Sequence, residues 1–283
     1  MSDHRLVFMG GLHRSGTTML ARLLAEHPDV SGFADTGVPA DEGQHLQSVY
    51  PVVAAGRQAG RFARADGAHL TECSPLVTDA NRRLLYEEWS RHWDLSRPVL
   101  LEKSPPNMLL TRFLQAMFPD TASFLLVVRH PIAVSAATQK WSDTRPDQLL
   151  AHWTAAHRTL RGDLPALERA LIVRYERLVE DPDRELARVH EFLGLAAYGA
   201  GRRVAEGVNA DNFAQDRTPR SGSNERYFER WRSRGRSPLR RAYLRTAERR
   251  AQPEAGRFGY ELAGFATRRP DDMLVARLAG EAA

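Results

Sequence analysis

A glycine-rich stretch near the start of the chain, GGLHRSGTTML (residues 10–20), has the residue types of an anion-binding loop. Gly11 and Gly16 have the spacing of a nucleotide-binding P-loop. Such a loop, set between a strand and a helix, directs backbone N–H groups and the positive end of the helix dipole at one anion. A nucleoside triphosphatase needs a lysine directly after Gly16, but Thr17 stands there and the cation lies within the loop, at Arg14. The stretch therefore predicts an anion site in which Arg14 supplies the positive charge.

Two more cations follow predicted strands and are candidates for the same chemistry. Arg129 ends the apolar run SFLLVVR, and the fixed fork of a guanidinium suits a phosphate. Lys103 follows the run PVLLE, and the chain has only one other lysine, Lys140. An ammonium in that place can stabilise negative charge that develops on a bridging oxygen as a bond breaks. We therefore expect Arg129 to contact a phosphate and Lys103 to contact a reacting group.

The spacing of apolar residues predicts the elements that position these groups. Short apolar runs indicate buried strands at residues 5–11, 98–102, 123–129 and 169–176. Helical spacing marks residues 17–27, 108–118, 131–141 and 181–195. Alternating strands and helices indicate a parallel sheet covered on both faces. We therefore predict an α/β fold with a P-loop-type central parallel sheet flanked by helices, in a single domain over residues 1–283.

Two segments depart from this alternation. Residues 31–68 are rich in Gly, Asp, Gln and His and favour a loop with one short helix. Residues 197–223 are polar and irregular, whereas residues 224–250 favour helix and carry many arginines. We expect residues 5–195 to form the nucleotide-binding core and residues 31–68 and 197–250 to be variable segments that form an acceptor site or a lid.

The three cationic motifs together resemble those of sulfotransferases that use 3′-phosphoadenylyl sulfate, over residues 5–195. The loop with arginine at position 14 is most similar to that of the tyrosylprotein and bacterial branch. The resemblance implies 3′-phosphoadenylyl sulfate as the donor co-substrate, whose single α-phosphate ends in a sulfuryl group, and no required metal. It also implies that the loop holds the 5′-phosphosulfate through His13, Arg14, Ser15, Gly16, Thr17 and Thr18.

The same resemblance assigns the other donor contacts. Arg129 would bind the 3′-phosphate, and Lys103, in a segment similar to the family's K-[SD]-P, would contact the sulfuryl group. The family usually has a serine eight residues after this arginine, but Ala137 stands there, so Ser135 is the nearby candidate. Tyr175 matches a tyrosine that contacts the donor. The segment over the nucleotide supplies further candidates, which are Arg217, Arg220 and Asn224.

Three residues are candidates for the base that sulfuryl transfer needs, and we rank Asp35 first, His45 second and Glu42 third. Asp35 lies 21 residues after Arg14, where the tyrosylprotein branch has a glutamate. His45 is an alternative, because the cytosolic branch uses a histidine and imidazole titrates near neutral pH. Glu42 could share one helix face with His45 at a spacing of three. Asp41 and Glu42 could instead cap the helix that starts there.

Composition limits the class of protein. The chain has 283 residues, of which 42% are hydrophobic, and a net charge of +5, which weakly favours an anionic ligand. Its one cysteine, Cys73, excludes an internal disulfide, and no apolar run is long enough to span a membrane. We expect a cytoplasmic protein with a glycan, glycolipid or small-metabolite acceptor and no nucleic-acid partner. Two alternatives stay open: a P-loop kinase, and an RNA-binding protein that uses the arginines of residues 226–250.

Overall fold

The computed structural model describes residues 4–53, 56–199 and 224–267. Its centre is a five-stranded parallel sheet with the strand order β2-β3-β1-β4-β5. The strands are β1 (Arg5–Gly10), β2 (Val30–Gly32), β3 (Val99–Lys103), β4 (Ala122–Val128) and β5 (Ala170–Arg174). Because all five run in the same direction, the segments that follow them meet at one edge of the sheet. The predicted α/β class with a central parallel sheet is confirmed.

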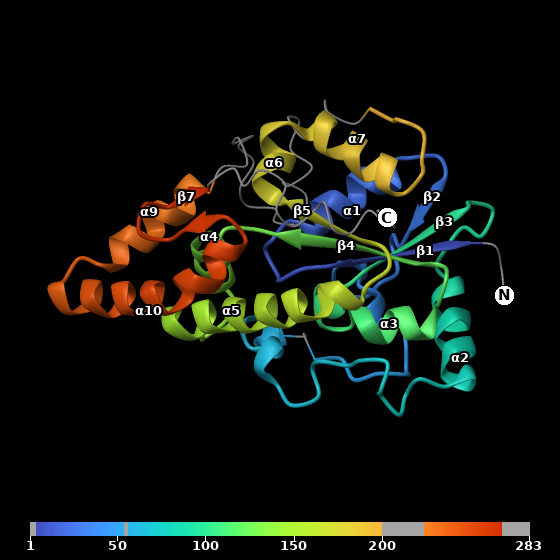
Figure 1. The fold of residues 1–283 in the computed structure, drawn as a ribbon, viewed down its shortest axis with the longest axis horizontal. Helices are drawn as coiled ribbons and strands as arrows, with labels where there is room; N and C mark the ends of the chain where they lie inside the picture. Colours follow the sequence, from blue (N-terminus) through green and yellow to red (C-terminus); the bar gives the residue numbers. More distant parts are fainter. Residues whose placement is uncertain (1–3, 54–55, 200–223, 268–283) are drawn as a thin grey trace.

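Helices cover both faces of this sheet (Figure 1). One face carries α1 (Thr17–Ala25), α6 (Tyr175–Glu180) and α7 (Pro182–Phe192). The other carries α2 (Asp79–Ser90), α3 (Thr111–Met117) and α5 (Pro146–Asp163), and α4 (Pro131–Thr138) follows the end of β4. Among the described residues no helix is both long and apolar enough to cross a bilayer.

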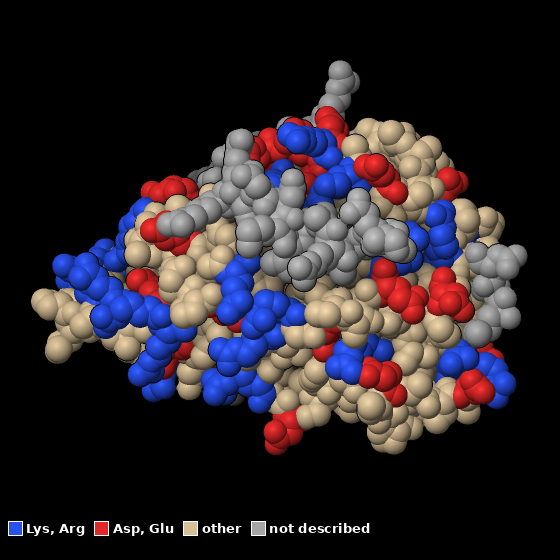
Figure 2. Space-filling view, in the orientation of Figure 1, with Lys and Arg blue, Asp and Glu red and all other residues tan. Residues whose placement is uncertain are grey.

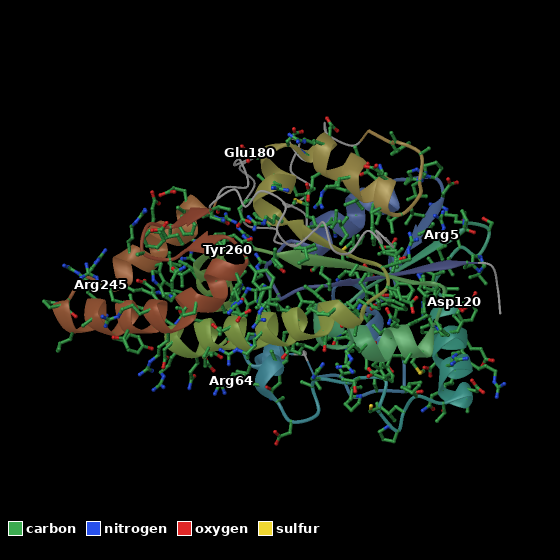
Figure 3. All side chains as sticks on the ribbon, in the orientation of Figure 1. Arg5, Arg64, Asp120, Glu180, Arg245 and Tyr260 are labelled. Carbon is green, nitrogen blue, oxygen red and sulfur yellow. The ribbon has the colours of Figure 1, made fainter. Side chains whose placement is uncertain are left out.

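Two helices near the end of the described chain, α9 (Glu225–Arg234) and α10 (Pro238–Arg257), extend beyond the carboxyl edge of the sheet (Figure 1). Lys and Arg side chains gather over this part of the visible surface (Figure 2). Arg245 points away from the sheet, whereas Tyr260 lies close to the end of β4 (Figure 3). The outer surface of α10 is therefore basic, and the strand pair β6 (Tyr260–Glu261) and β7 (Ala266–Thr267) follows it near the sheet.

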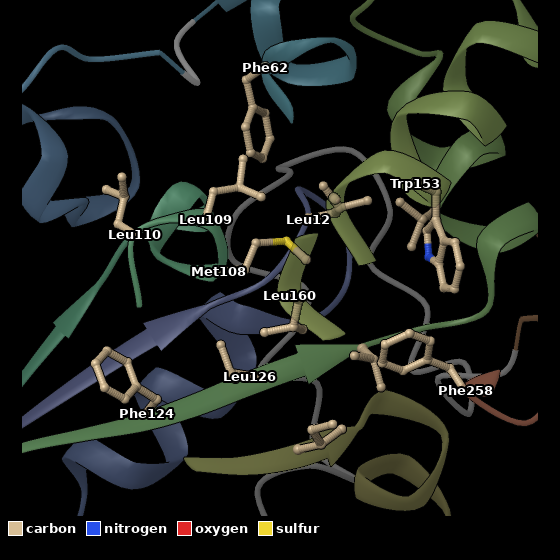
Figure 4. Close-up of a cluster of buried hydrophobic side chains, with 14 of the residues drawn as sticks. Leu12, Phe62, Met108, Leu109, Leu110, Phe124, Leu126, Trp153, Leu160 and Phe258 are labelled. Atoms are coloured by element: carbon tan, nitrogen blue, oxygen red, sulfur yellow. The ribbon is translucent and has the colours of Figure 1, made fainter. Parts of the chain in front are cut away.

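The alternation of side chains along β1 fills two separate hydrophobic cores. Leu6 and Phe8 point into the core shared with α2, α3 and α5, part of which is shown in Figure 4. Val7 and Met9 point into the core under α1, α6 and α7. A strand that is apolar on both faces fits only the middle of a covered parallel sheet, and this fixes the site's loop to a rigid element.

The structure differs from the sequence-based expectations in several elements. The edge strand β2 overlaps the start of the segment expected to be loop. The same segment contains the short 3₁₀ turns η1 (Pro39–Asp41), η2 (Gly43–His45), η3 (Gly56–Gly60) and η4 (Phe62–Arg64). Residues 108–118 are not one helix, because the 3₁₀ turn η5 (Pro105–Leu109) precedes α3. The arginine-rich helix is two helices, since Gly235 ends α9 and Ser237 caps α10. These features depend on partners elsewhere in the chain, which local spacing does not report.

Candidate active site

The glycine-rich loop joins β1 to α1 and is closely packed. The backbone N–H and the hydroxyl of Ser15 both donate to the Leu12 carbonyl, which closes the turn. Arg14 has φ 70° and Gly16 has φ 105°, and Gly16 precedes α1 without a side-chain cap. A methyl group at Gly16 would lie 2.5 Å from Cδ2 of Tyr175. Glycine is therefore required here both for the backbone angle and for the approach of the α6 tyrosine.

Arg129, directly after β4, connects this loop to the rest of the site. Its side chain is buried, and one guanidinium nitrogen donates to the Arg14 carbonyl at 2.9 Å. Its Nε donates to Oδ1 of Asn224 at 2.8 Å. The guanidinium carbon lies 3.7 Å from the ring centroid of Tyr175, a cation–π contact that is strengthened by burial. The structure thus brings four predicted residues together: Arg14, Arg129, Tyr175 and Asn224.

Tyr227 on α9 lies among three arginines of this site. Arg226 donates to its hydroxyl at 2.8 Å, and the Arg129 guanidinium lies 5.1 Å from its ring centroid. Burial acts to raise the pKa of Tyr227, but the charges of Arg129, Arg226 and Arg14 outweigh burial, so the net pKa is lowered. Burial lowers the pKa of Arg14, and the nearby Tyr227 partly offsets this by raising it. Guanidinium groups this close together make an environment suited to an anion.

Glu176 holds the remote segments of the site against the strand ends. Its carboxylate accepts from the His130 backbone N–H at 2.9 Å and from Nδ2 of Asn224 at 2.7 Å. It also accepts from the hydroxyl of Tyr260 at 2.9 Å. One carboxylate therefore ties α6, the start of α4, the start of α9 and β6 together. Asn224, which bonds both Glu176 and Arg129, is oriented by this cluster.

Lys103 and Glu42 form a second, adjacent cluster. Lys103 Nζ lies 3.4 Å from Oε1 of Glu42 and donates to the Ala40 carbonyl at 2.7 Å. Burial lowers the pKa of Lys103, while Glu42 opposes the shift. Nε2 of His45 lies 4.0 Å from the Glu42 carboxylate, so the pair predicted at a spacing of three is in contact range. Glu42 does not act as a simple helix cap, because its carboxylate faces Lys103.

His13, within the loop, lies beside this second cluster. Its ring packs edge-on against Phe62, with the centroids 5.6 Å apart. The pKa of His13 is lowered, mainly by burial. The charge of Glu42 acts to raise this pKa, and the charge of Lys103 acts to lower it further. The loop, the end of β3 and the segment after β2 thus converge on one region, as the sequence motifs predicted.

The other candidates are placed as follows. Asp35 is exposed, with φ 53°, in the loop between β2 and η1. Ser135 is buried within α4, and its hydroxyl has no hydrogen-bond partner among the described residues. Thr17 is buried at the start of α1, whereas Thr18 is half-buried. Arg217 and Arg220 lie outside the described residues.

Sequence reasoning missed three residues that shape the site: Tyr227, Glu176 and Glu102. Glu102 is fully buried beside Lys103, and burial raises its pKa to about 7. The one available signal was the acidic residue inside the apolar run PVLLE, because a charge rarely interrupts a buried strand without a partner. The contacts of Tyr227 and Glu176 join residues far apart in the chain and have no local pattern.

Comparison with known proteins agrees with the motifs. The chain is 27% identical over 271 residues to nodulation protein NoeE of Sinorhizobium fredii, covering 81% of this chain and 60% of that protein. It is 29% identical over 205 residues to protein-tyrosine sulfotransferase 2 of Gallus gallus, covering 68% of this chain and 51% of that protein. The chain thus spans about half to two thirds of the length of these curated relatives.

A solved structure and a family model complete the comparison. The sulfotransferase domain of the Synechococcus PCC 7002 olefin synthase has the same fold, with a TM-score of 0.53 and 20% identity, covering 91% of this chain and 95% of that one. The model of the sulfotransferase family matches residues 7–198, which contain the loop, β3 with Lys103, and β4 with Arg129. The chain therefore belongs to the sulfotransferase family.

Proposed function

We propose that this chain transfers a sulfuryl group from 3′-phosphoadenylyl sulfate to a hydroxyl or amine of an acceptor. The observation that carries the proposal is the bond from the Arg129 guanidinium to the Arg14 carbonyl. This bond brings the cation after β4 beside the glycine-rich loop, which supports a role for both arginines in binding one nucleotide. Two phosphate-bearing positions on one adenosine are the feature that separates this donor from ATP.

The roles follow from the two clusters. The loop N–H groups and Arg14 hold the 5′-phosphosulfate, with Ser15, Gly16, Thr17 and Thr18 shaping the loop and His13 at its side. Arg129 binds the 3′-phosphate, oriented by Asn224 and Tyr175. Ser135, with its buried hydroxyl, is a further candidate for that phosphate. The donor is bound by protein groups alone in this scheme.

The transfer step uses Lys103 and a nearby base. The acceptor oxygen attacks sulfur while the bond from sulfur to the bridging phosphate oxygen breaks, and the acceptor proton passes to the base. Lys103 and Arg14 stabilise the negative charge on the leaving adenosine 3′,5′-bisphosphate. We propose Glu42 as the base in place of Asp35, which the sequence ranked first, because Glu42 is buried beside Lys103, whereas Asp35 is exposed in this structure. His45, whose Nε2 lies 4.0 Å from the Glu42 carboxylate, would influence how readily Glu42 accepts the proton.

The acceptor is proposed only as a chemical class. A hydroxyl or amine of a glycan, a glycolipid or a small metabolite has the proton that Glu42 would take. The segment from η1 to η4 lies beside Lys103 and His13 and would form one wall of the acceptor site.

A thermal-shift measurement tests the donor class. Adenosine 3′,5′-bisphosphate at about 100 times its dissociation constant should raise the melting temperature by roughly 5 °C or more, because it binds only the folded chain. ATP with magnesium and adenosine 5′-phosphate are the matched comparisons, since each lacks the 3′-phosphate. An equal shift with ATP and magnesium would favour a kinase, and no shift at saturating bisphosphate would contradict the proposal.

A further inference from the structure

Glu102 is a carboxyl group buried inside the sheet, one residue before the proposed transfer lysine. It pairs in register with Phe8 of β1 and is fully buried. Burial of an unpaired carboxylate is costly, so a buried one is expected to be hydrogen-bonded. The Ser104 hydroxyl donates to Oε1 at 2.5 Å, and the Asn107 amide donates to the other carboxylate oxygen. Both oxygens of Glu102 are therefore used by groups of its own strand end and of η5.

The same serine holds the segment that carries Glu42. The Gln44 backbone N–H donates to the Ser104 hydroxyl oxygen at 2.9 Å. Gly43 packs directly on the Glu102 carboxylate, and a methyl group there would overlap it. Trp89 Nε1 also donates to the Gly43 carbonyl, at 3.0 Å. The backbone of η2 is thus fixed against the end of β3 rather than free in solvent.

The contacts continue from this backbone to the proposed base. Gln44 Nε2 donates to Oε2 of Glu42 at 2.6 Å. The other carboxylate oxygen of Glu42 lies 3.4 Å from Lys103 Nζ. Starting at Glu102 and passing through Ser104, Gln44 and Glu42, the contacts end at Lys103, the residue next to Glu102. The two ends of this ring are consecutive residues of one rigid strand.

We infer that Glu102 is a positioning residue for sulfuryl transfer, which acts through Ser104 and Gln44 to hold Glu42 and Lys103 at fixed separation. The inference rests on the proposed function. Glu102 is fully buried and both of its carboxylate oxygens are bonded within the protein, so we expect it to act through its neighbours rather than by contact with the donor. Its removal should therefore leave nucleotide binding intact and misplace the base and the lysine. Displacement of a reacting group by about 1 Å is enough to slow a reaction strongly.

The first test is Glu102→Gln, which keeps the size of the side chain but gives it an amide donor. If the new amide N–H faces the Asn107 amide, two donors oppose each other; if it faces Ser104, the hydroxyl must accept from it instead of donating, so one of the two present bonds is lost or reversed. We expect the thermal shift with adenosine 3′,5′-bisphosphate to stay close to that of the wild type. We expect release of the bisphosphate from 3′-phosphoadenylyl sulfate, with water or 2-naphthol as the acceptor, to fall on the order of tenfold or more.

A pair of serine variants separates positioning from loss of stability. Ser104→Ala removes the hydroxyl that joins Glu102 to Gln44, and Ser104→Thr restores a hydroxyl at that place. Ala should lower turnover like Glu102→Gln, and Thr should recover much of it. The control is Asp163→Asn, which alters another buried carboxylate, whose partners are His69, Thr111 and Arg112 rather than any residue of the ring of contacts. Its turnover per folded molecule should match the wild type.

Each outcome decides between the possibilities. Wild-type turnover in Glu102→Gln or Ser104→Ala, or a loss of bisphosphate binding that equals the loss of turnover, overturns the positioning role. A loss of turnover in Asp163→Asn as large as in Glu102→Gln does the same, because it assigns the effect to stability. Failure of the wild-type chain to bind the bisphosphate overturns the proposed function instead, so the two failures are distinguishable.

Discussion

At the scale of single residues, the two arginines of the site have different surroundings and different expected duties. Arg14 is half-buried, lies over the exposed ring of Trp141 at 4.7 Å and belongs to the loop itself. Arg129 is buried and held by Asn224, Tyr175 and the loop backbone. A guanidinium held in this way loses little freedom when it binds a phosphate, so Arg129 is suited to recognition. Arg14, which is less buried, is suited to the 5′-phosphosulfate, where negative charge develops as the bond from sulfur to the bridging oxygen breaks.

The identity of the base is the residue-scale question that mutation can answer. Glu42→Gln should lower the release of adenosine 3′,5′-bisphosphate by about 100-fold, because general bases contribute on the order of 10²–10⁴. Asp35→Asn, the matched control, should lower it by less than about threefold. Steady-state turnover with 2-naphthol measures both. The reverse order of effects would assign the base to Asp35 and place Glu42 in the support of Lys103.

The part of the site that could be predicted from the sequence consists of residues that belong to a local sequence pattern. The loop, Lys103 and Arg129 each follow an apolar run, and the structure places all three at one edge of the sheet. Tyr227 and Glu176 could not be predicted, because their partners lie in other elements, such as Arg129 for Tyr227 and Tyr260 for Glu176. Glu102 was visible as a charge in a strand, but its ring of contacts needed the position of η2.

At the scale of elements, the fold was predicted best where apolar runs are long and buried. Four of the five parallel strands correspond to predicted runs, with ends shifted by one or two residues. The strand β2 was missed because it has three residues and is an edge strand beside β3. The helices α2 and α5 were also missed. In α5, two buried histidines, His152 and His157, interrupt the apolar face. Packing, rather than propensity, decides such helices.

Buried histidines in α5 and at the start of α4 lead us to predict that stability depends on pH. Burial lowers the pKa of His152 and of His157 to about 3, and that of His130 at the start of α4 is lowered likewise. The unfolded chain takes up protons on these rings as pH falls below their ordinary value of 6.5, whereas the folded chain does not. The free energy of unfolding should therefore decrease as pH falls from 6.5 toward 3, by up to about 1.4 kcal/mol per pH unit for each ring.

His152→Phe isolates one of these contributions. Both ring nitrogens of His152 lack a hydrogen-bond partner among the described residues, and the ring packs edge-on against Phe62 at 4.8 Å. We expect the variant to be as stable as the wild type at pH 7 or more stable. Between pH 6.5 and 5 it should lose less stability, by about 1 kcal/mol per pH unit. Urea unfolding at three pH values measures this, and parallel curves for the two proteins would contradict the assignment.

At the scale of the whole molecule, the site depends on a part of the chain outside the family match. The match ends at residue 198, yet Asn224 and Tyr227 complete the surroundings of Arg129. The buried face of α9, with Tyr227, Phe228 and Trp231, packs inward, so these rings do not offer a stacking surface for RNA. The outward face of α10 carries the basic charge instead (Figure 2). Residues 224–267 therefore contribute to the surroundings of Arg129 as well as to the basic surface.

The sequence indicated that residues 224–250 are helical and rich in arginine. It did not indicate where they pack, because their position depends on the hydrogen bonds around Glu176. Asn224 and Tyr260, at the two ends of the α9 and α10 region, both donate to the Glu176 carboxylate. A network that joins three separate segments is formed only in the folded chain, so no spacing in the sequence reports it.

The measurement that tests the central claim most directly is a calorimetric cycle on Arg129 and the 3′-phosphate. The wild-type chain and Arg129→Met, which keeps an unbranched aliphatic side chain but removes the guanidinium that lies over Tyr175, are each titrated with adenosine 3′,5′-bisphosphate and adenosine 5′-phosphate. We predict that the wild type prefers the bisphosphate by at least about tenfold, the worth of one charge-assisted hydrogen bond. Arg129→Met should lose most of that preference while its affinity for adenosine 5′-phosphate changes by less than about threefold. A wild type without preference, or a variant that keeps the full preference, would contradict the assignment of the 3′-phosphate to Arg129 and with it the proposed donor.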